Sequence, residues 1–365
     1  MLNYINVFRA LAIILIVLGH SFFIENRIFG KVVTEIFSSG TVLFVFISGF
    51  LFQHLSYKYE TKTYYKKKFL NVISPYLITS IPGIIICFLV PSLNPFYGLS
   101  PFIQIPIFLS TGAIHNSPTW YIPMTCGFFV LAPILLFLER KRIKNFKLLY
   151  LLLPLFLLIT VACQRTGVDN KFLVHSDYTY MQRYLMNVNF IFSAFVNLFS
   201  IYVLGMFFSA HKDKIKTLYN HKIFLFILMI LVAVADVILC TNHLYVNGTL
   251  SKAFLVLIIL GYLEHYDEQI IAHTKINHIA DIIAKYSFAI FFIHRYLIKL
   301  LTVILQKFNI ARETYIYNGS TCIKAFLIFL AFFTFAFCGS LILAWIIKKL
   351  CQICKIKNTR AVIGA

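Results

Sequence analysis

Long runs of apolar residues dominate the chain, and short polar segments separate them. A membrane-crossing helix needs about 20 mainly apolar residues. Runs near this length predict spans at residues 5–24, 40–57, 69–90, 119–138, 147–163, 190–208, 222–240, 248–263, 286–306 and 325–347. The run at 248–263 is short, and we expect Lys252 to extend toward the membrane surface at its outer end. The pattern predicts an all-α integral membrane protein, a bundle of about ten transmembrane helices.

Lysine and arginine are distributed unevenly between these spans. They are concentrated at 58–68, 139–147 and 209–222 and after Ile347, whereas 25–39, 91–118, 164–189, 241–247 and 307–324 carry few. Cytoplasmic loops carry the excess of basic residues, so both termini are predicted to be cytoplasmic. The acidic loop 264–281 falls on the same side by alternation. We divide the chain into a single membrane domain, 1–350, and a short basic cytoplasmic tail, 351–365.

Composition excludes a water-soluble protein. Of the 365 residues, 60% are hydrophobic and 13% charged, and the mean hydropathy is +0.83, which leaves too few charges to cover a soluble surface. The formal charge of +20 lies in short runs between apolar segments, so it indicates topology rather than nucleic-acid binding. As a membrane protein, the chain is expected to have membrane lipids as partners. The eight scattered cysteines suggest no disulfide framework, and the single pair Cys351 and Cys354 is too little to assign a metal site.

Ionisable residues inside the predicted spans are the first candidates for function, because each costs about 2.5–3.5 kcal/mol on insertion scales. They are Arg9, His20, Asp236, His294, Arg295 and Lys299. Arg9 and His20 are separated by eleven positions, which places them within about 20° on one helix face and about 16 Å apart along the axis. With the N-terminus cytoplasmic, Arg9 lies near that surface and His20 in the outer half. The alternative is an ordinary basic anchor followed by an interfacial histidine.

Shorter motifs follow in the later spans. Ser48 and Gly49 stand together in the second span, where small residues permit close helix approach and a hydroxyl can bond to a neighbouring helix. Lys68 ends a run of three lysines at the start of the third span, and Trp120 with Tyr121 begins the fourth. Each also has a structural explanation, as a packing, topology or interfacial residue.

In their order, these motifs resemble acyltransferase family 3, a family of bacterial membrane acyltransferases, over most of the chain. The family's Arg-x10-His is matched by Arg9 and His20, its Ser-Gly by Ser48 and Gly49, and its tryptophan-aromatic pair and late histidine by Trp120, Tyr121 and His294. One departure concerns the third span. The family commonly carries Arg-x-x-Arg there, and this chain has Lys68-Phe-Leu-Asn71, which keeps one cation and loses the second.

The resemblance implies an O-acyltransferase that moves an acyl group, by default acetyl, from acyl-CoA to a hydroxyl of a cell-surface glycan or its lipid-linked precursor. Acyl-CoA is then a cosubstrate, with no permanently bound cofactor, and the protein is a multi-pass protein of the bacterial cytoplasmic membrane. A neutral imidazole suits removal of the hydroxyl proton, so His20 is the expected base and Arg9 the expected ligand of a donor phosphate. Donor or substrate binding is expected of Lys68, Ser48, Trp120 and His294. The alternatives are a polysaccharide or solute exporter and a structural partner of a glycan-synthesis complex.

Overall fold

The computed structural model describes residues 2–37, 40–114, 119–143, 146–163, 178–242, 248–310 and 322–365. Almost all of these residues are helical. The only strands in the described part of the chain are β1 (Arg142–Ile143) and β2 (Phe146–Lys147), which form one antiparallel pair. The prediction of an all-α fold is confirmed.

The elements follow one another in a chain of helices of very different length. The first half contains α1 (Asn3–Ser21), α2 (Arg27–Phe37), α3 (Gly40–His54), the 3-10 turn η1 (Ser56–Lys58), α4 (Thr61–Lys68), the π-helical turn η2 (Phe69–Ile73), α5 (Ser74–Leu89), the 3-10 turn η3 (Pro91–Leu93), α6 (Pro101–Thr111), α7 (Tyr121–Arg140), α8 (Leu148–Leu151) and α9 (Leu153–Cys163). The second half contains α10 (Tyr180–Ala210), α11 (Asp213–Asn220), α12 (Lys222–Thr241), α13 (Thr249–His265), α14 (Asp267–Ala272), α15 (Thr274–Lys307), α16 (Cys322–Ile353) and α17 (Arg360–Ile363).

Within the described residues, eight helical stretches are long and apolar enough to cross a membrane. They are α1, α2 with α3, α4 with α5, α7, α10, α12, α15 and α16. The predicted spans at 147–163 and 248–263 correspond to shorter helices, because Leu152 separates α8 from α9 and α13 has 17 residues. The total of ten spans stays a prediction. The structure also contains helices in segments that the pattern predicts as connections between spans, among them α2 and α6.

The centre of the bundle is built on the close contact of α3 with α10. A side chain at Gly49 would collide with the backbone of Tyr202, and one at Gly205 would collide with the backbone of Phe46. Each helix therefore presents a glycine to the backbone of the other, which lets the two backbones approach closely. The predicted packing role of Gly49 is confirmed, and α3 is held in a fixed position from which Ser48 can serve the candidate site.

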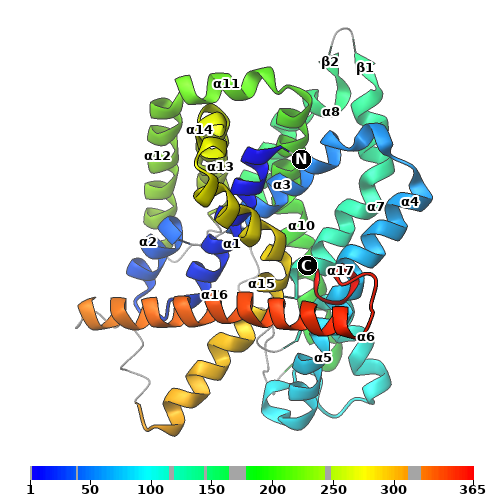
Figure 1. Cartoon of the computed structure of the whole chain (residues 1–365), viewed down its shortest axis with the longest axis vertical. Helices are drawn as coiled ribbons and strands as arrows, with labels where there is room; N and C mark the ends of the chain where they lie inside the picture. Colours follow the sequence, from blue (N-terminus) through cyan, green and yellow to red (C-terminus); the bar gives the residue numbers. More distant parts are fainter. Residues whose placement is uncertain are drawn as a thin grey trace.

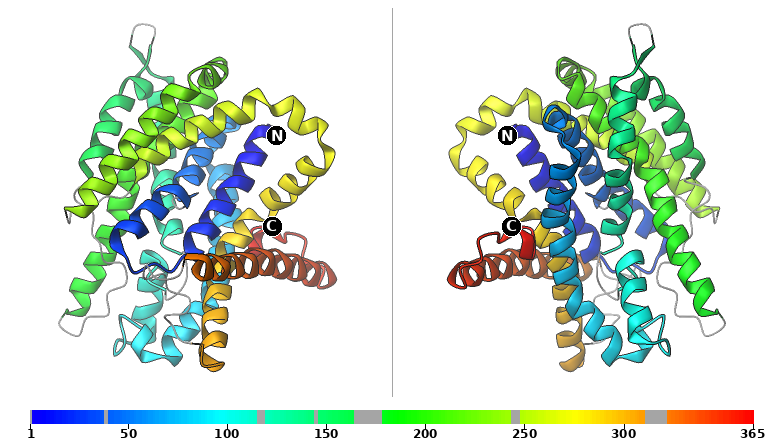
Figure 2. Two further views of the ribbon diagram at one scale, coloured as in Figure 1. Left: turned by 90° about the vertical axis from the view of Figure 1, so that its left-hand side faces the viewer. Right: turned by 90° about the vertical axis from the view of Figure 1, so that its right-hand side faces the viewer.

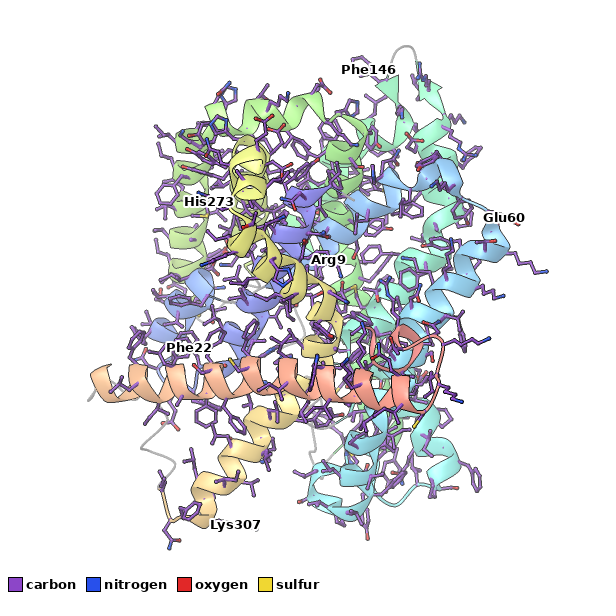
Figure 3. The ribbon with its side chains drawn as sticks, in the orientation of Figure 1. Arg9, Phe22, Glu60, Phe146, His273 and Lys307 are labelled. Carbon is purple, nitrogen blue, oxygen red and sulfur yellow. The ribbon has the colours of Figure 1, made fainter. Side chains whose placement is uncertain are left out.

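Two of the segments rich in lysine and arginine, 139–147 and 209–222, lie toward the end of the bundle that holds the N-terminus. The β1–β2 hairpin and α11 lie at this end in Figure 1, while Lys307 lies at the opposite end in Figure 3. The segment 91–114, which contains η3 and α6, also lies toward the opposite end and forms a small core with α5 around Phe96 and Phe108. This grouping agrees with the distribution of charge along the chain, and the assignment of the basic end to the cytoplasm stays a prediction.

The last long helix does not run alongside its neighbours. In Figures 1 and 2, α16 crosses α15 at a steep angle, and its Phe329 stacks on Phe22 at the end of α1, with ring centroids 3.9 Å apart. Residues 351–353, assigned to the tail, complete α16. Residues 360–363 then form α17, which packs against η2 and α5. The segment predicted as a tail is thus partly folded onto the bundle.

Candidate active site

Helices α1 and α15 form the framework of the site. Arg9 contacts Ser287, and His20 contacts His294 farther along both helices, so residue numbers rise together and the helices run parallel. The face of α1 that carries Arg9 and His20 is therefore the face that packs on α15. The prediction that both side chains share one face is confirmed, and the two contacts make two levels of one interface.

The level at the C-terminal end of α1 is a pair of histidines. The Nδ1 atom of His20 lies 2.9 Å from the Nε2 atom of His294, and the two rings stack with their centroids 5.1 Å apart. On its other side, the Nδ1 atom of His294 lies 3.0 Å from the carbonyl oxygen of Ile290. His294 is fully buried.

These contacts fix the protonation pattern of a neutral pair. A carbonyl oxygen only accepts, so Nδ1 of His294 carries a hydrogen and donates it to Ile290. Nε2 of His294 must then accept, which requires Nδ1–H of His20 to donate. The lone pair of His20 is consequently placed on its Nε2 atom. The arrangement can hold one imidazole in the tautomer and orientation that a base requires.

The level of Arg9, nearer the N-terminal end of α1, opens into a cavity. The guanidinium of Arg9 donates to the hydroxyl of Ser287 at 3.2 Å, and that hydroxyl donates to the carbonyl of Ala284 at 2.8 Å. Both Arg9 and Ser287 line a cavity of about 880 Å³ between α1, α3, η2, α15 and α17. Figure 3 places Arg9 near the middle of the molecule, beside α15.

The second and fourth spans contribute to the same cavity. Ser48 and Tyr121 both line it. In the Ser-Gly pair, Ser48 therefore borders the cavity, while Gly49 packs against α10. Trp120 precedes Tyr121 at the start of α7 and packs edge-on against Phe190 at 5.4 Å. The ring of Tyr121 contacts Phe291, which in turn contacts His294, so aromatic contacts connect Trp120 to the histidine pair.

The third span presents a different side chain from the one expected. Asn71 lines the cavity, whereas Lys68 does not appear among its described lining residues. The Nζ atom of Lys68 lies over the rings of Phe129 and Tyr64, at 4.5 and 5.3 Å from their centroids. The π-helical turn η2 begins directly after Lys68, and such a turn changes the register of the side chains that follow it. Donor binding by Lys68 stays a prediction.

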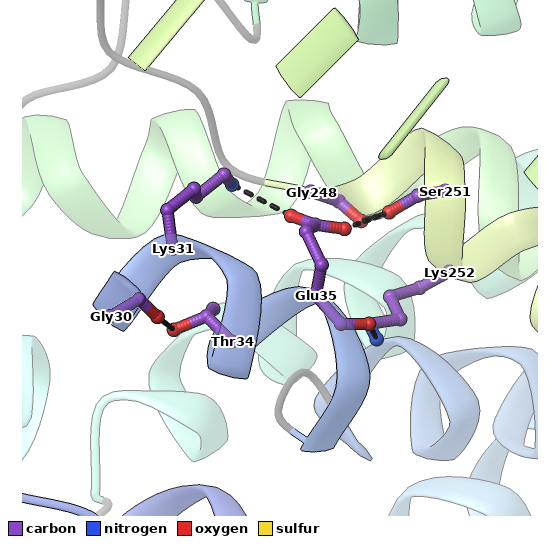
Figure 4. A network of polar contacts seen from close by, with 7 residues as sticks. All are labelled: Gly30, Lys31, Thr34, Glu35, Gly248, Ser251 and Lys252. Atoms are coloured by element: carbon purple, nitrogen blue, oxygen red, sulfur yellow. Dashed lines mark hydrogen bonds and ion pairs between the residues drawn. The ribbon is translucent and has the colours of Figure 1, made fainter. Parts of the chain in front are cut away.

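A second polar cluster lies on α2 and α13, away from this cavity. Lys31 and Glu35 form an ion pair at 2.7 Å, Ser251 donates to the same carboxylate at 2.5 Å, and Lys252 donates to the carbonyl of Glu35 (Figure 4). The expectation that Lys252 extends to the membrane surface is wrong, because its side chain is only 2% exposed and turns inward to a backbone acceptor. The nearby α12 carries Asp236, also buried.

Two site residues were missed from the sequence. Ser287, the partner of Arg9, is one polar residue in an apolar helix, and only its spacing of seven from His294 places both on one face. Arg360 lines the cavity from α17, and its setting in a basic segment gave no sign of this. The described residues contain no group of three or more metal-ligating side chains, and Cys351 and Cys354 are free thiols at the end of α16.

Comparison with known proteins gives one match. A family model described as an acyltransferase domain, that of acyltransferase family 3, matches residues 2–348. No curated protein and no solved structure matches the chain. The family match covers nearly the whole chain, so the chain belongs to acyltransferase family 3 and is a multi-pass membrane acyltransferase.

Proposed function

We propose, starting from this membership, that the protein transfers an acyl group, by default acetyl, from acyl-CoA to a hydroxyl of a cell-surface glycan or its lipid-linked precursor. The observation that carries the proposal is the His20–His294 pair, held on the same helix interface as the Arg9 cavity. One level offers an oriented base and the other an anion-binding group. An O-acyltransferase using a phosphate-bearing thioester needs both.

In the proposed reaction, the acceptor hydroxyl attacks the thioester carbonyl carbon while Nε2 of His20 takes its proton. The carbon–sulfur bond of the tetrahedral intermediate then breaks, and the imidazolium returns the proton to the leaving thiolate, giving the ester and free coenzyme A. As His20 becomes charged, its Nδ1–H bond to Nε2 of His294 becomes a charge-assisted hydrogen bond. His294 therefore acts as a positioning residue that supports the charge on the base.

The spacing of the two levels suits the shape of the donor. Eleven helical residues separate Arg9 from His20, about 16 Å along α1. Coenzyme A carries its phosphates at one end of an extended pantetheine arm and the thioester at the other. With the phosphates held at the Arg9 cavity, the arm can place the thioester near His20. The acceptor then approaches from the membrane side opposite the basic loops.

The test uses purified protein in lipid nanodiscs with [1-¹⁴C]acetyl-CoA and the surface-glycan fraction of cells that lack the protein. We expect label to enter the glycan and free coenzyme A to appear only when the glycan fraction is present. The His20→Gln protein is the matched control and should do both at least roughly a hundredfold more slowly. Accumulation of solute inside sealed vesicles without any acyl transfer would instead support the exporter.

A further inference from the structure

The segment after α16 is docked at the candidate donor cavity. The hydroxyl of Ser74 at the start of α5 donates to the carbonyl of Ala361 at 2.7 Å, and Ile363 is 2% exposed. Gly364 has φ +80 and presses against the ring of Phe288 on α15, so closely that a side chain there would collide with it. The left-handed backbone and the close contact both favour glycine. These two contacts and the burial of Ile363 hold α17 against α5 and α15.

Docking of α17 brings an arginine from the far end of the sequence to the cavity. Arg360 lines it together with Arg9 and Lys285, and the only acidic side chain among the described lining residues is Asp281. Asp281 already accepts a hydrogen bond from Asn6. Among the described lining side chains, three are cationic and one is anionic, a balance that favours an anionic ligand.

We infer that Arg360, on α17, is a ligand of the donor phosphates. It supplies a cation to a cavity that the third span lines with the uncharged Asn71. This inference rests on the proposed use of acyl-CoA. A guanidinium presents a planar fork that matches two phosphate oxygens, and Asn71 has no charge with which to replace it. Arg360 is exposed and lines the cavity, so a ligand in the cavity can reach its guanidinium.

The experiment measures binding of coenzyme A and of adenosine 3′,5′-bisphosphate to the purified full-length protein by isothermal titration calorimetry. Arg360→Gln should weaken both by roughly tenfold, the effect of one lost charge-assisted contact. Lys357→Gln is the matched control, since it removes the same charge from an exposed position in the same segment, outside the cavity lining, and should leave the affinity unchanged.

Two further variants separate a direct contact from a general effect of charge or folding. Gly364→Val keeps Arg360 but should displace α17 from Phe288, and should weaken binding as Arg360→Gln does. Asn71→Arg in the Arg360→Gln protein should restore much of the affinity, because it returns a cation to the same cavity.

The outcomes distinguish the two proposals. If the wild-type protein binds coenzyme A and Arg360→Gln binds it equally well, or if Lys357→Gln causes the same loss, the role of Arg360 is overturned and the proposed function stands. If the wild-type protein binds neither compound, both are overturned.

Discussion

Two clusters of ionisable side chains lie within this apolar bundle, and they differ in what their charged groups face. Around Glu35, the carboxylate is shared between Lys31 and Ser251, and Lys252 meets a backbone carbonyl. Around α1 and α15, by contrast, Arg9 makes one hydrogen bond to a neutral hydroxyl and borders a cavity of about 880 Å³. The first cluster has the features of a structural contact that holds α2 to α13, and the second those of a site that can bind a ligand.

The comparison shows that the cost of an intramembrane charge does not by itself indicate function. Glu35 and Lys31 lie at 6% and 8% side-chain exposure and satisfy each other locally, as an i, i+4 pair. Arg9 and His20 instead find their partners more than 270 positions away, on α15. If the two clusters divide catalysis from stability, substitutions between α1 and α15 should impair the reaction, and substitutions around Glu35 should lower stability.

The largest effect is expected at His20. His20→Gln keeps similar size and hydrogen bonding but cannot take up the proton, so turnover should fall by roughly 10²–10⁴-fold. Coenzyme A binding, measured by calorimetry, should survive, because the Arg9 cavity is left intact. Near-normal turnover in folded His20→Gln protein, with collapse in His294→Gln, would move the base to α15.

A smaller effect is expected at His294, which acts through His20. His294→Leu removes the acceptor of the Nδ1–H bond and should lower turnover by roughly tenfold to a hundredfold. In His294→Gln, the side-chain oxygen can still accept this bond, so part of the turnover should return. Equal losses in the two variants, at equal melting temperature, would argue against the proposed support of the base.

Donor affinity should respond to Arg9 more than to Lys68. Arg9→Ala removes a cation that borders the cavity, so the KM for acyl-CoA should rise by roughly tenfold or more while kcat changes little. Lys68→Ala should have a smaller effect, because its Nζ atom lies over Phe129 and Tyr64. An effect of Lys68→Ala equal to that of Arg9→Ala would place Lys68 among the donor ligands, as the sequence predicted.

The smallest effect on turnover is expected at Glu35. Glu35→Leu breaks a buried ion pair and should cost about 3–5 kcal/mol of stability, seen as a lower melting temperature in nanodiscs. Turnover per folded molecule should stay within a factor of two of the wild type. Glu35→Gln, which can still accept from Ser251, should be the milder variant. A large loss of turnover at unchanged stability would show that this cluster also takes part in catalysis.

Sequence patterns predicted most of the helices because membrane burial imposes a length and an apolarity that can be counted. The failures have local causes. Helix α2 has the apolar periodicity of an amphipathic helix at Ile28, Phe29, Val32, Val33 and Ile36. Its 11 residues are fewer than the about 20 that identify a full membrane span. The inward partner of Lys252 is the carbonyl of Glu35, which lies on α2. Because the pattern did not predict α2, it gave Lys252 no partner inside the bundle, and the surface was the expected place for its charge.

For the site, the sequence by itself determined that Arg9 and His20 share a face, because helical geometry fixes the angle between residues eleven positions apart. It also determined that Gly49 belongs to a close helix contact, although α10 as the partner came only from the structure. Only the tertiary structure decided that the Arg9–His20 face meets Ser287 and His294, and that α17 returns to the cavity with Arg360. The physical reason is that periodicity records which side of a helix is special, whereas the partner of that side depends on how helices far apart in the chain pack together.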